Sequence, residues 1–444
     1  MSLYHHLLSK IIVPIGDVFF GNKYRKSLNL WIKYDSLSAE RLNEIQNKNL
    51  KETLKYTLKN VPFYTNIAYD ENLSPQENLL KFPVLTKDLL RSKRENLVSK
   101  EFNVSDLQKN FSSGSSGIQS YSYSTKRNKF MIQGIQNHWY MWSGYRIGDK
   151  IVQFGISPNR TLPKKLKDIF YRTNYQNAFS LSDADYQNIY NQISKSNTKY
   201  IIGYPSAINE LSVYFIKNNL SHQFDGIILL GDKLYSHYEK NFNQSFLNPK
   251  IVDTYGCAEG FLMACKIDLP YYYIMNPHVF IEIVDENNNP VKDGEMGFVL
   301  VSCFTNWAQP FIRYKLGDLA IKLPKEKYPK NSRFNYPLLE KVVGRETDIV
   351  RTPNGKTLIV HSFTGIFEFY PEIKQYKIIQ TALDKIKIEY ITDNYFPFTN
   401  DTLIEIKDKI AVLTQESLKV NFEKVDTIAP TKSGKPQIIV SLIN

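Results

Sequence analysis

Two Ser-Ser-Gly steps stand side by side in the segment FSSGSSGIQSYSYST, residues 111–125. Glycine lets backbone amides turn toward an anion without a Cβ penalty, and serine hydroxyls add further donors, so a loop of this composition can wrap a phosphate group. A flexible connector would have the same composition. It is not a Walker A loop, because no Gly-Lys-Ser/Thr step follows.

Four later segments combine glycine with charged or aromatic side chains, in the order KIVDTYGCAEG, RYKLGDLA, VVGRETDIVRTPNGK and PTKSGKPQ. Each segment alone has a plainer interpretation as a turn, an exposed charged loop or a solvated tail. Their order and separation make that interpretation hard to keep for the whole series. The side chains and glycines of interest in them are Tyr255, Gly256, Glu259, Gly317, Asp318, Arg345 and Lys435.

In this order the motifs resemble those of the superfamily of acyl-CoA synthetases, nonribosomal adenylation domains and luciferases, which run Ser/Thr-Gly-rich loop, YGxTE, YxxGD, GRxxD and SGK. The phenylacetate–CoA ligase and CapK-like branch is more similar, since it shares VPFY at 61–64, FPVLTK at 82–87 and a KIIQ-type stretch at 377–380. The resemblance covers nearly the full chain. It implies an AMP-forming ligase that converts a carboxylate and ATP to an acyl-AMP and pyrophosphate.

The resemblance also implies a role for each matching residue. Tyr255 would lie against the adenine, and Glu259 would coordinate Mg²⁺, which offsets charge on the pyrophosphate leaving group. Asp318 would bind the ribose hydroxyls, with support from Arg345. Lys435 would be the catalytic lysine, whose charge stabilises the transition state at the α-phosphate. The other nucleotide-binding positions are Ser112, Ser113, Gly114, Ser115, Ser116 and Gly117, which would hold the phosphates, with Gly231 and Gly256.

The chain departs from the family pattern at three places. The Pro-Lys that often follows the loop is replaced by Ile-Gln-Ser at 118–120, so phosphate neutralisation would rest more on Mg²⁺ and Lys435. In GIILLGDKL the acidic position after the glycine is shifted to Asp232, and Thr347 takes a hinge position where several relatives carry Asp or Lys. None of these changes removes a group that adenylation requires.

Two residue sets have more than one interpretation. Cys257, Cys265, His278 and Cys303 could hold the structural zinc that some relatives carry, but no Cys-x-x-Cys pair is present, and buried thiols are the plainer expectation. His138, in QNHWYMW, could line an acyl pocket, although a histidine among aromatic residues on a helix is more often packed in a core. We expect packing for His138.

The elements that must position these groups follow from apolar patterning. Residues 39–59 carry apolar side chains at helical spacing, which predicts an amphipathic helix within a helical N-terminal shell. The apolar runs 150–156, 199–205, 226–232 and 250–256 alternate with helical segments, which predicts an α/β fold with a largely parallel sheet covered by helices. Three of these runs end in Gly, Pro or Asp, at the sheet edge where open α/β sheets bind ligands.

Residues 273–304 instead show period-2 strands joined by the polar turns DENNNP and KDGE, which predicts a smaller β subdomain. We place the domain boundary at 343/344. Residues 1–343 would form a large ATP- and acyl-binding domain with sheets from about residue 110, and residues 344–444 a small mobile α+β domain that carries the catalytic lysine. The resemblance implies that this domain rotates about residues 346–348 between half-reactions.

Composition and charge bound the class of partner. The chain is 42% apolar and 23% charged, as globular proteins are, and its net charge is +12. The excess lies in the first 343 residues, because the remainder carries 13 basic and 13 acidic residues. Without a compact Lys/Arg run or a recognisable module, nucleic-acid binding is not expected, whereas a polyphosphate ligand or an anionic membrane surface suits a diffuse basic charge.

The cysteine count and the N-terminus bear on location. Three cysteines without a regular spacing indicate a reducing compartment, and we expect a cytoplasmic protein. The apolar N-terminal segment has neither the cleavage site of a signal peptide nor the length of a membrane span, which leaves a peripheral membrane contact open.

The motifs leave the carboxylate, the acyl acceptor and the oligomeric state open. The branch resemblance suggests surface or capsular polysaccharide biosynthesis, with a sugar hydroxyl or amine as the acceptor. An aryl- or acyl-CoA ligase, with CoA as a further ligand besides ATP and Mg²⁺, and a nucleotidyl transferase are alternatives within the fold. A non-catalytic nucleotide-binding scaffold is an alternative of another class, but a scaffold needs neither Glu259 nor Lys435.

Overall fold

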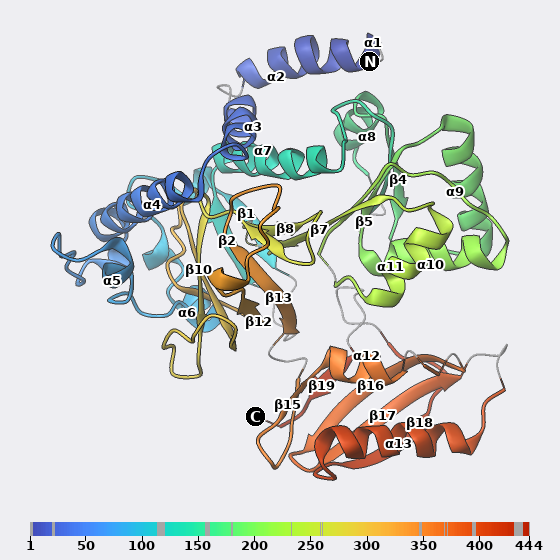
Figure 1. Cartoon of the computed structure of the whole chain (residues 1–444). Helices are drawn as coiled ribbons and strands as arrows, with labels where there is room; N and C mark the ends of the chain where they lie inside the picture. Colours follow the sequence, from blue (N-terminus) through green and yellow to red (C-terminus); the bar gives the residue numbers. More distant parts are fainter. Residues whose placement is uncertain are drawn as a thin grey trace.

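The computed structural model contains a large N-terminal part built on an eleven-stranded sheet and a C-terminal part built on a four-stranded sheet (Figure 1). It describes residues 3–19, 23–112, 120–155, 160–178, 181–231, 233–257, 259, 261–345, 349–367, 369–370, 372–392, 397–429 and 438–443.

The N-terminal region is a helical shell, as the apolar spacing predicted. Helix α4 (Ala39–Asn60) begins after Ser38, whose side chain accepts a hydrogen bond from the Arg41 amide, and it buries Leu42, Leu50 and Leu54. The other helical pieces of this shell are α1 (Leu3–Leu7), η1 (Leu8–Ile12), α2 (Val13–Phe19), α3 (Lys23–Tyr34), η2 (Pro62–Tyr64), α5 (Pro75–Leu79), α6 (Lys87–Ser92), η3 (Glu95–Leu97) and η4 (Val104–Asp106).

A small antiparallel hairpin frames the serine-glycine segment. Strands β1 (Gln108–Ser112) and β2 (Ser120–Ser124) pair from Gln108 with Ser124 to Ser112 with Ser120. Helix α7 (Lys126–Trp142) follows at once, and the Thr125 side chain caps it by accepting a hydrogen bond from the Asn128 amide. The hairpin therefore leads directly into α7.

The four predicted strands 150–156, 199–205, 226–232 and 250–256 form the parallel half of the large sheet. An additional edge strand, β4, pairs with β3. The bounds are β3 (Ile151–Gly155), β4 (Thr173–Asn177), β5 (Tyr200–Gly203), β6 (Gly226–Leu229) and β7 (Lys250–Gly256), with helices α8 (Leu162–Phe170), α9 (Asp183–Ser196), α10 (Pro205–Lys217) and α11 (Ser236–Ser245).

Alternate side chains of these strands serve two cores. Ile227 and Leu229 of β6 pack with α9, α10 and α11, whereas Ile228 between them packs with α7 and with Trp31 of α3. Period-2 alternation requires this division, because successive strand residues point to opposite faces. Both faces of the parallel half are thus covered by helices (Figure 1).

The antiparallel strands extend the same sheet. The order is β10-β11-β12-β13-β9-β8-β7-β6-β5-β3-β4, and the change of direction occurs where β7 pairs with β8. The predicted β region 273–304, which contains β10 and β11, is therefore continuous with the parallel half. The added strands are β8 (Leu262–Lys266), β9 (Tyr272–Ile274), β10 (Val279–Val284), β11 (Met296–Cys303), β12 (Tyr314–Lys322) and β13 (Leu338–Arg345), with the turn η5 (Lys325–Lys327).

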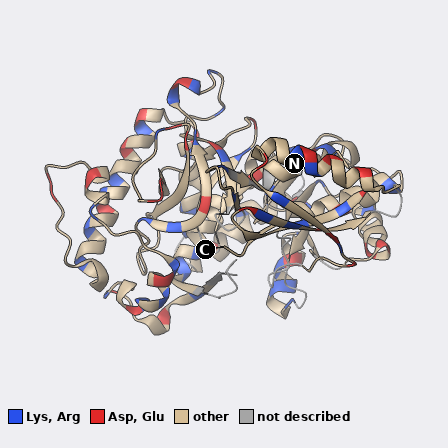
Figure 2. Cartoon of the chain, turned by 90° about the horizontal axis from the view of Figure 1, so that it is seen from below, with Lys and Arg blue, Asp and Glu red and all other residues tan. Residues whose placement is uncertain are grey.

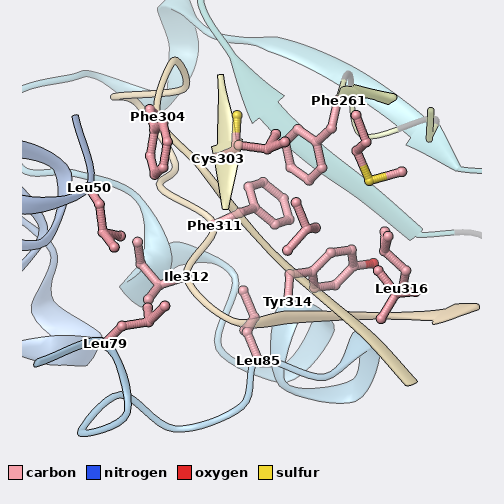
Figure 3. Close-up of a cluster of buried hydrophobic side chains, with 14 of the residues drawn as sticks. Leu50, Leu79, Leu85, Phe261, Cys303, Phe304, Phe311, Ile312, Tyr314 and Leu316 are labelled. Carbon is pink, nitrogen blue, oxygen red and sulfur yellow. The ribbon is translucent and has the colours of Figure 1, made fainter. Parts of the chain in front are cut away.

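A buried cluster joins this antiparallel half to the helical shell (Figure 3). Leu50 and Leu79 come from the shell, and Phe311 and Tyr314 come from the end of the β11–β12 connection and the start of β12. The Leu85 amide donates to the Arg313 carbonyl at 3.1 Å, so the FPVLTK segment is tied directly to β12.

The C-terminal part has a core of its own. Its sheet has the order β18-β17-β16-β19, and Ile378, Ile388, Ile406 and Ile439 are buried together. Basic and acidic residues are interspersed in the view from below (Figure 2). The elements are β14 (Ile349–Arg351), β15 (Thr357–Ile359), α12 (Val360–Phe367), β16 (Ile373–Ala382), β17 (Lys385–Thr392), α13 (Asn400–Thr414), β18 (Lys419–Lys424) and β19 (Ile439–Ser441).

None of the helices in the described ranges has the length and apolar character needed to cross a bilayer.

Candidate active site

Two buried hydrogen bonds gather the predicted side chains beyond the end of β7. The Tyr255 hydroxyl donates to Asp318 Oδ2 at 2.9 Å, and the Tyr314 hydroxyl donates to Glu259 Oε1 at 2.8 Å. All four residues are buried. Three residues that the sequence singled out, separated by up to 63 positions, therefore belong to one site.

Tyr314 is a site residue that the motif analysis did not single out. It is the first residue of the YKLGD sequence, and it stands at the first position of β12, whereas Asp318 stands four residues later on the same strand. The YxxGD pattern contained a signal for it, because a tyrosine stands at the first position of that motif. Tyr314 fixes the orientation of the Glu259 carboxylate.

Two glycines allow the backbone turns at this edge. A Cβ on Gly256 would lie 2.7 Å from the Phe261 carbonyl oxygen, so the chain can turn back toward β8 here only without a side chain. Gly231 has a φ of +70° just beyond β6, at the same sheet edge as Tyr255. Both glycines lie at the ends of parallel strands, and their role in nucleotide binding stays a prediction.

Arg345 is the register partner of Asp318, on the neighbouring strand β13. The backbone pairing thus brings Asp318 of the GD motif beside Gly344 and Arg345, with which the GRETD motif begins. Lys233 also reaches β13, since its Nζ donates to the carbonyl oxygen of Val343. The loop after β6 is thereby connected to the strand that leads into the C-terminal part.

A cavity of about 540 Å³ lies beside Glu259, between the β1–β2 hairpin and α7. Among the described residues that line it, Ile132 is the one apolar side chain. Ligand pockets are usually lined mainly by apolar side chains, so this lining is unusual. The polar side chains are Gln108, Lys109, Asn110, Ser124, Asn128, Lys129, Gln133, Gln136 and Glu259.

The amides of α7 are available to a ligand. Asn110 is already engaged, because its Nδ2 donates to Ser124 Oγ at 2.9 Å. The side chains of Asn128, Gln133 and Gln136 line the cavity and form no hydrogen bond with another residue in the described ranges. Two lysines, Lys109 and Lys129, also line the cavity and add positive charge. The cavity can therefore take a polar or anionic molecule next to Glu259.

Several predicted positions lie outside the described residues. These are the central loop residues Ser113, Gly114, Ser115, Ser116 and Gly117, the hinge residues 346–348, Asp232 and Lys435. Ser112 ends β1 at the mouth of the hairpin. Strand β19 begins four residues after Lys435 and pairs with β16 of the C-terminal sheet.

The ambiguous histidine and cysteines have structural positions. His138 Nε2 lies 2.9 Å from Asp35 Oδ2 and the ring is packed against Trp142, so the expected packing is what the structure shows. Cys265 and Cys303 are buried in different cores, and burial raises the pKa of both thiols. In the described ranges no group of three His, Cys, Asp or Glu side chains is arranged to hold a metal ion.

Comparison with known proteins agrees with the motif analysis. Residues 350–442 match the family model described as the CapK C-terminal domain. The chain is 24% identical to protein CapK of Staphylococcus aureus, over 99% of each chain. The predicted resemblance to the CapK-like branch is thus confirmed.

Solved structures of adenylate-forming ligases have the same fold. 2-Hydroxyisobutyryl-CoA ligase in its postadenylation state, with a bound acyl-AMP, is similar with a TM-score of 0.71 and 15% identity, over 92% of this chain and 91% of that one. ATP-bound MatB from Rhodopseudomonas palustris is similar with a TM-score of 0.55 and 13% identity, over 76% and 68%. The predicted α/β fold class is confirmed.

The same ligase in its thioesterification state, with 2-HIB-AMP and CoA bound, is similar with a TM-score of 0.57 and 16% identity, again over 92% of this chain.

Proposed function

We propose that this chain is an AMP-forming ligase that converts a carboxylate and ATP to an acyl-AMP and pyrophosphate. The observation that carries the proposal is the meeting of Tyr255, Asp318 and Glu259 at one sheet edge, with Glu259 facing a cavity. These residues come from three separate motifs, and a scaffold has no need to assemble them. Open α/β sheets bind ligands at this edge.

Each side chain has a distinct task in the proposed reaction. Asp318, oriented by the Tyr255 hydroxyl, accepts hydrogen bonds from the ribose hydroxyls, and the Tyr255 ring lies against the adenine. The serine-glycine loop donates to the phosphates through backbone amides and hydroxyls. Arg345 supports the ribose end from β13. These contacts hold the α-phosphate in place for attack by the substrate carboxylate.

The donor set at Glu259 fits Mg²⁺. This cation is usually held by one or two protein carboxylates together with substrate phosphates and water, so a single carboxylate at the edge of a cavity is sufficient. Mg²⁺ would offset the charge on the departing pyrophosphate. Tyr314 keeps the Glu259 carboxylate oriented toward that position.

Lys435 supplies the catalytic cation. Negative charge builds on the α-phosphate in the transition state, and a lysine brought by the C-terminal domain stabilises it without blocking the later acceptor. We keep the domain boundary at 343/344 and the hinge at residues 346–348. The pairing of β19 with β16 supports this role, because it ties the chain just beyond Lys435 to the C-terminal sheet.

The cavity indicates the class of carboxylate. Its amide-rich lining on α7 and its two lysines suit a hydrophilic acid that carries hydroxyl groups or a second anionic group. An aliphatic or aromatic acid would leave these amides without partners, which costs binding energy. A hydrophilic acid is consistent with acyl transfer to a sugar hydroxyl or amine in surface-polysaccharide biosynthesis.

The second candidate is an acyl-CoA ligase. 2-Hydroxyisobutyryl-CoA ligase binds CoA in the same fold, and its acid is small and hydroxylated. Both candidates share the adenylation step and differ in the acceptor. Thioester formation that depends on CoA would favour the ligase.

Pyrophosphate release with a panel of carboxylates, ATP and Mg²⁺ tests the proposal. Lys435→Ala should lower the rate by on the order of 10²-fold or more while calorimetry still detects ATP binding. Lys432→Ala, in the same segment, is the matched control and should keep the rate. Pyrophosphate release by none of the acids, or an unchanged rate in Lys435→Ala, would count against an adenylating enzyme and favour the scaffold.

A further inference from the structure

The N-terminal helix exposes an apolar face. Residues of α1, η1 and α2 form consecutive helical turns, and Leu7, Ile11, Ile15 and Val18 recur on them at helical spacing. These four side chains are 43% to 60% exposed. Single exposed apolar side chains are common, but a continuous row of them on one helix face marks an interaction surface.

Helix α8 repeats the pattern. It carries Leu162, Leu166, Ile169 and Phe170, each between 49% and 74% exposed, and no residue of this helix is buried. Its sequence, LPKKLKDIF, intersperses three lysines with these apolar residues. The helix therefore contributes little to the core of the sheet, and its apolar residues are not explained by packing.

The two helices are held together. The Tyr4 hydroxyl donates to the Phe170 carbonyl oxygen at 2.7 Å, and the guanidinium group of Arg172 lies 4.1 Å from the centre of the Tyr4 ring. Leu8 is buried and its side chain lies against Gly148, where a Cβ would approach it to 3.1 Å. The N-terminal helix is thus docked through one face. Both helices lie on the side of the large domain away from the C-terminal part (Figure 1).

The acidic side chains of these two helices are buried or paired. Asp17 is the only acidic residue among the first 34, and it is buried, where it accepts hydrogen bonds from the amides of Tyr24 and Arg25 at 3.1 and 2.9 Å. Asp168 of α8 is neutralised by Arg160, whose Nε lies 2.9 Å from it. Lys10, Lys164 and Lys165 remain exposed. We call the exposed apolar side chains of Leu3–Phe19 and α8, with these three lysines, the α2–α8 surface.

We propose that the α2–α8 surface binds an anionic lipid bilayer, with both helices lying in the plane of the interface. Amphipathic helices with lysine beside apolar residues insert their apolar face at the headgroup boundary, and each lysine near an anionic surface adds to the attraction. The charge is complementary to such a surface. Lysine is depleted in the cores of protein–protein interfaces, which makes a protein partner the poorer fit. This proposal does not depend on the adenylation chemistry.

Flotation of the full-length chain with vesicles tests the proposal. We expect the chain to float with vesicles of phosphatidylcholine and phosphatidylglycerol, to float far less with phosphatidylcholine alone, and to dissociate as NaCl is raised, because salt screens the attraction. Lys164→Glu with Lys165→Glu should weaken binding to anionic vesicles about tenfold or more. Ile11→Asp with Ile15→Asp should weaken binding to a similar extent, because buried apolar area is lost.

Matched controls lie on the C-terminal part. Ile404→Asp with Val412→Asp changes two exposed apolar residues of α13, and Lys385→Glu with Lys407→Glu makes the same change of net charge. Both should bind anionic vesicles as the unmodified chain does, and far-UV circular dichroism checks that every variant is folded. Equal losses in surface and control variants would overturn the proposal. The proposal would also be overturned if the unmodified chain did not float with vesicles and formed, in sedimentation, a dimer that the surface variants abolish. That result would assign the surface to a second copy of the chain.

Discussion

The Tyr255 hydroxyl orients Asp318, the proposed ribose ligand. Tyr255→Phe removes the 2.9 Å hydrogen bond while keeping the ring. A hydrogen bond of this kind is worth about 1 kcal/mol, so we expect the KM for ATP to rise about fivefold with kcat nearly unchanged. Steady-state pyrophosphate release at varied ATP concentration measures both constants.

A matched control separates this effect from a general loss of stability. The ring of Tyr273 is buried beside Trp142 of α7, and its hydroxyl donates to Oδ2 of the exposed Asp268 at 3.1 Å. Tyr273→Phe therefore removes the same type of bond away from the site and should leave the KM for ATP unchanged. Equal KM values for ATP in the unmodified chain and in Tyr255→Phe would contradict the assignment of Asp318 to the ribose site.

His278 makes the stability of the large domain depend on pH. Burial lowers its pKa from the ordinary value of 6.5 to about 3, and its Nε2 atom is buried without a hydrogen-bond partner in the described ranges. Below pH 6.5 the unfolded chain binds a proton at His278 that the folded chain does not bind. The free energy of unfolding is therefore fully retained above pH 6.5 and falls as the pH is lowered.

The consequence can be measured by urea unfolding at pH 7 and pH 5. From pH 7 to pH 5, the free energy of unfolding should fall by about 2 kcal/mol more in the unmodified chain than in His278→Gln. Each pH unit below the unfolded pKa corresponds to about 1.36 kcal/mol. His222→Gln is a suitable comparison, because burial also lowers the pKa of His222 but its Nε2 already contacts the Thr198 carbonyl oxygen. An identical pH dependence with and without His278 would contradict the assignment.

At the level of single residues, Tyr255, Glu259 and Asp318 could be singled out because their motifs follow the order of the family pattern, and the structure brings them together. Their roles in adenylation stay predictions. Tyr314 was missed because its contribution is a contact with Glu259, and the contact exists only after β12 is placed beside the end of β7. The amides on α7 were missed for the same reason.

In the proposed reaction, helix α7 would select the acid, because Gln133 and Gln136 line the cavity. Gln133→Leu with Gln136→Leu replaces two amides by apolar groups of similar size. We expect activity with a hydrophilic acid to fall about tenfold or more, and activity with an aliphatic acid of equal length to rise relative to it. Adenylation rates with the two acids provide the ratio.

Asn137→Leu is the control on the same helix. Asn137 is not among the residues that line the cavity, and its Nδ2 donates to the backbone carbonyl of Gln133. This variant should keep the preference of the unmodified chain. A preference for the aliphatic acid in the unmodified chain would contradict a hydrophilic substrate without affecting the adenylation proposal.

Elements were predictable where burial dominates the sequence. The strands β3, β5, β6 and β7 are apolar runs, because both faces of the parallel half are covered. The edge strand β4 has the sequence TNYQN, and none of its residues is fully buried, so no apolar pattern marks it. The antiparallel pairing of β7 with β8, which makes one sheet of two predicted parts, depends on long-range register that local patterning does not contain.

At the scale of the whole molecule, two separate cores are connected by few contacts. The C-terminal core is built from residues after 349, and Tyr235 is the partly buried residue of the large domain that packs against it in the described ranges. Arg351 and Glu286 form a further ion pair at 3.9 Å, exposed to solvent and therefore weak. An interface of this kind is compatible with the proposed rotation of the C-terminal part between half-reactions.

Separate cores predict two thermal transitions. Phe154 is buried in the core of the parallel half, and Phe154→Ala should lower only the transition of the large domain, by about 5 °C for a loss of about 4 kcal/mol.

Gln380 is fully buried in the C-terminal part, where its amide donates to the Arg351 carbonyl and accepts from the Arg351 amide. Gln380→Leu should lower only the second transition, by about 10 °C for a loss of about 2 kcal/mol, because it leaves both backbone groups without partners. Gln375→Leu, exposed on the same strand, is the control. Differential scanning calorimetry resolves the two transitions, and a single transition that both variants lower would mean that the chain unfolds as one cooperative unit.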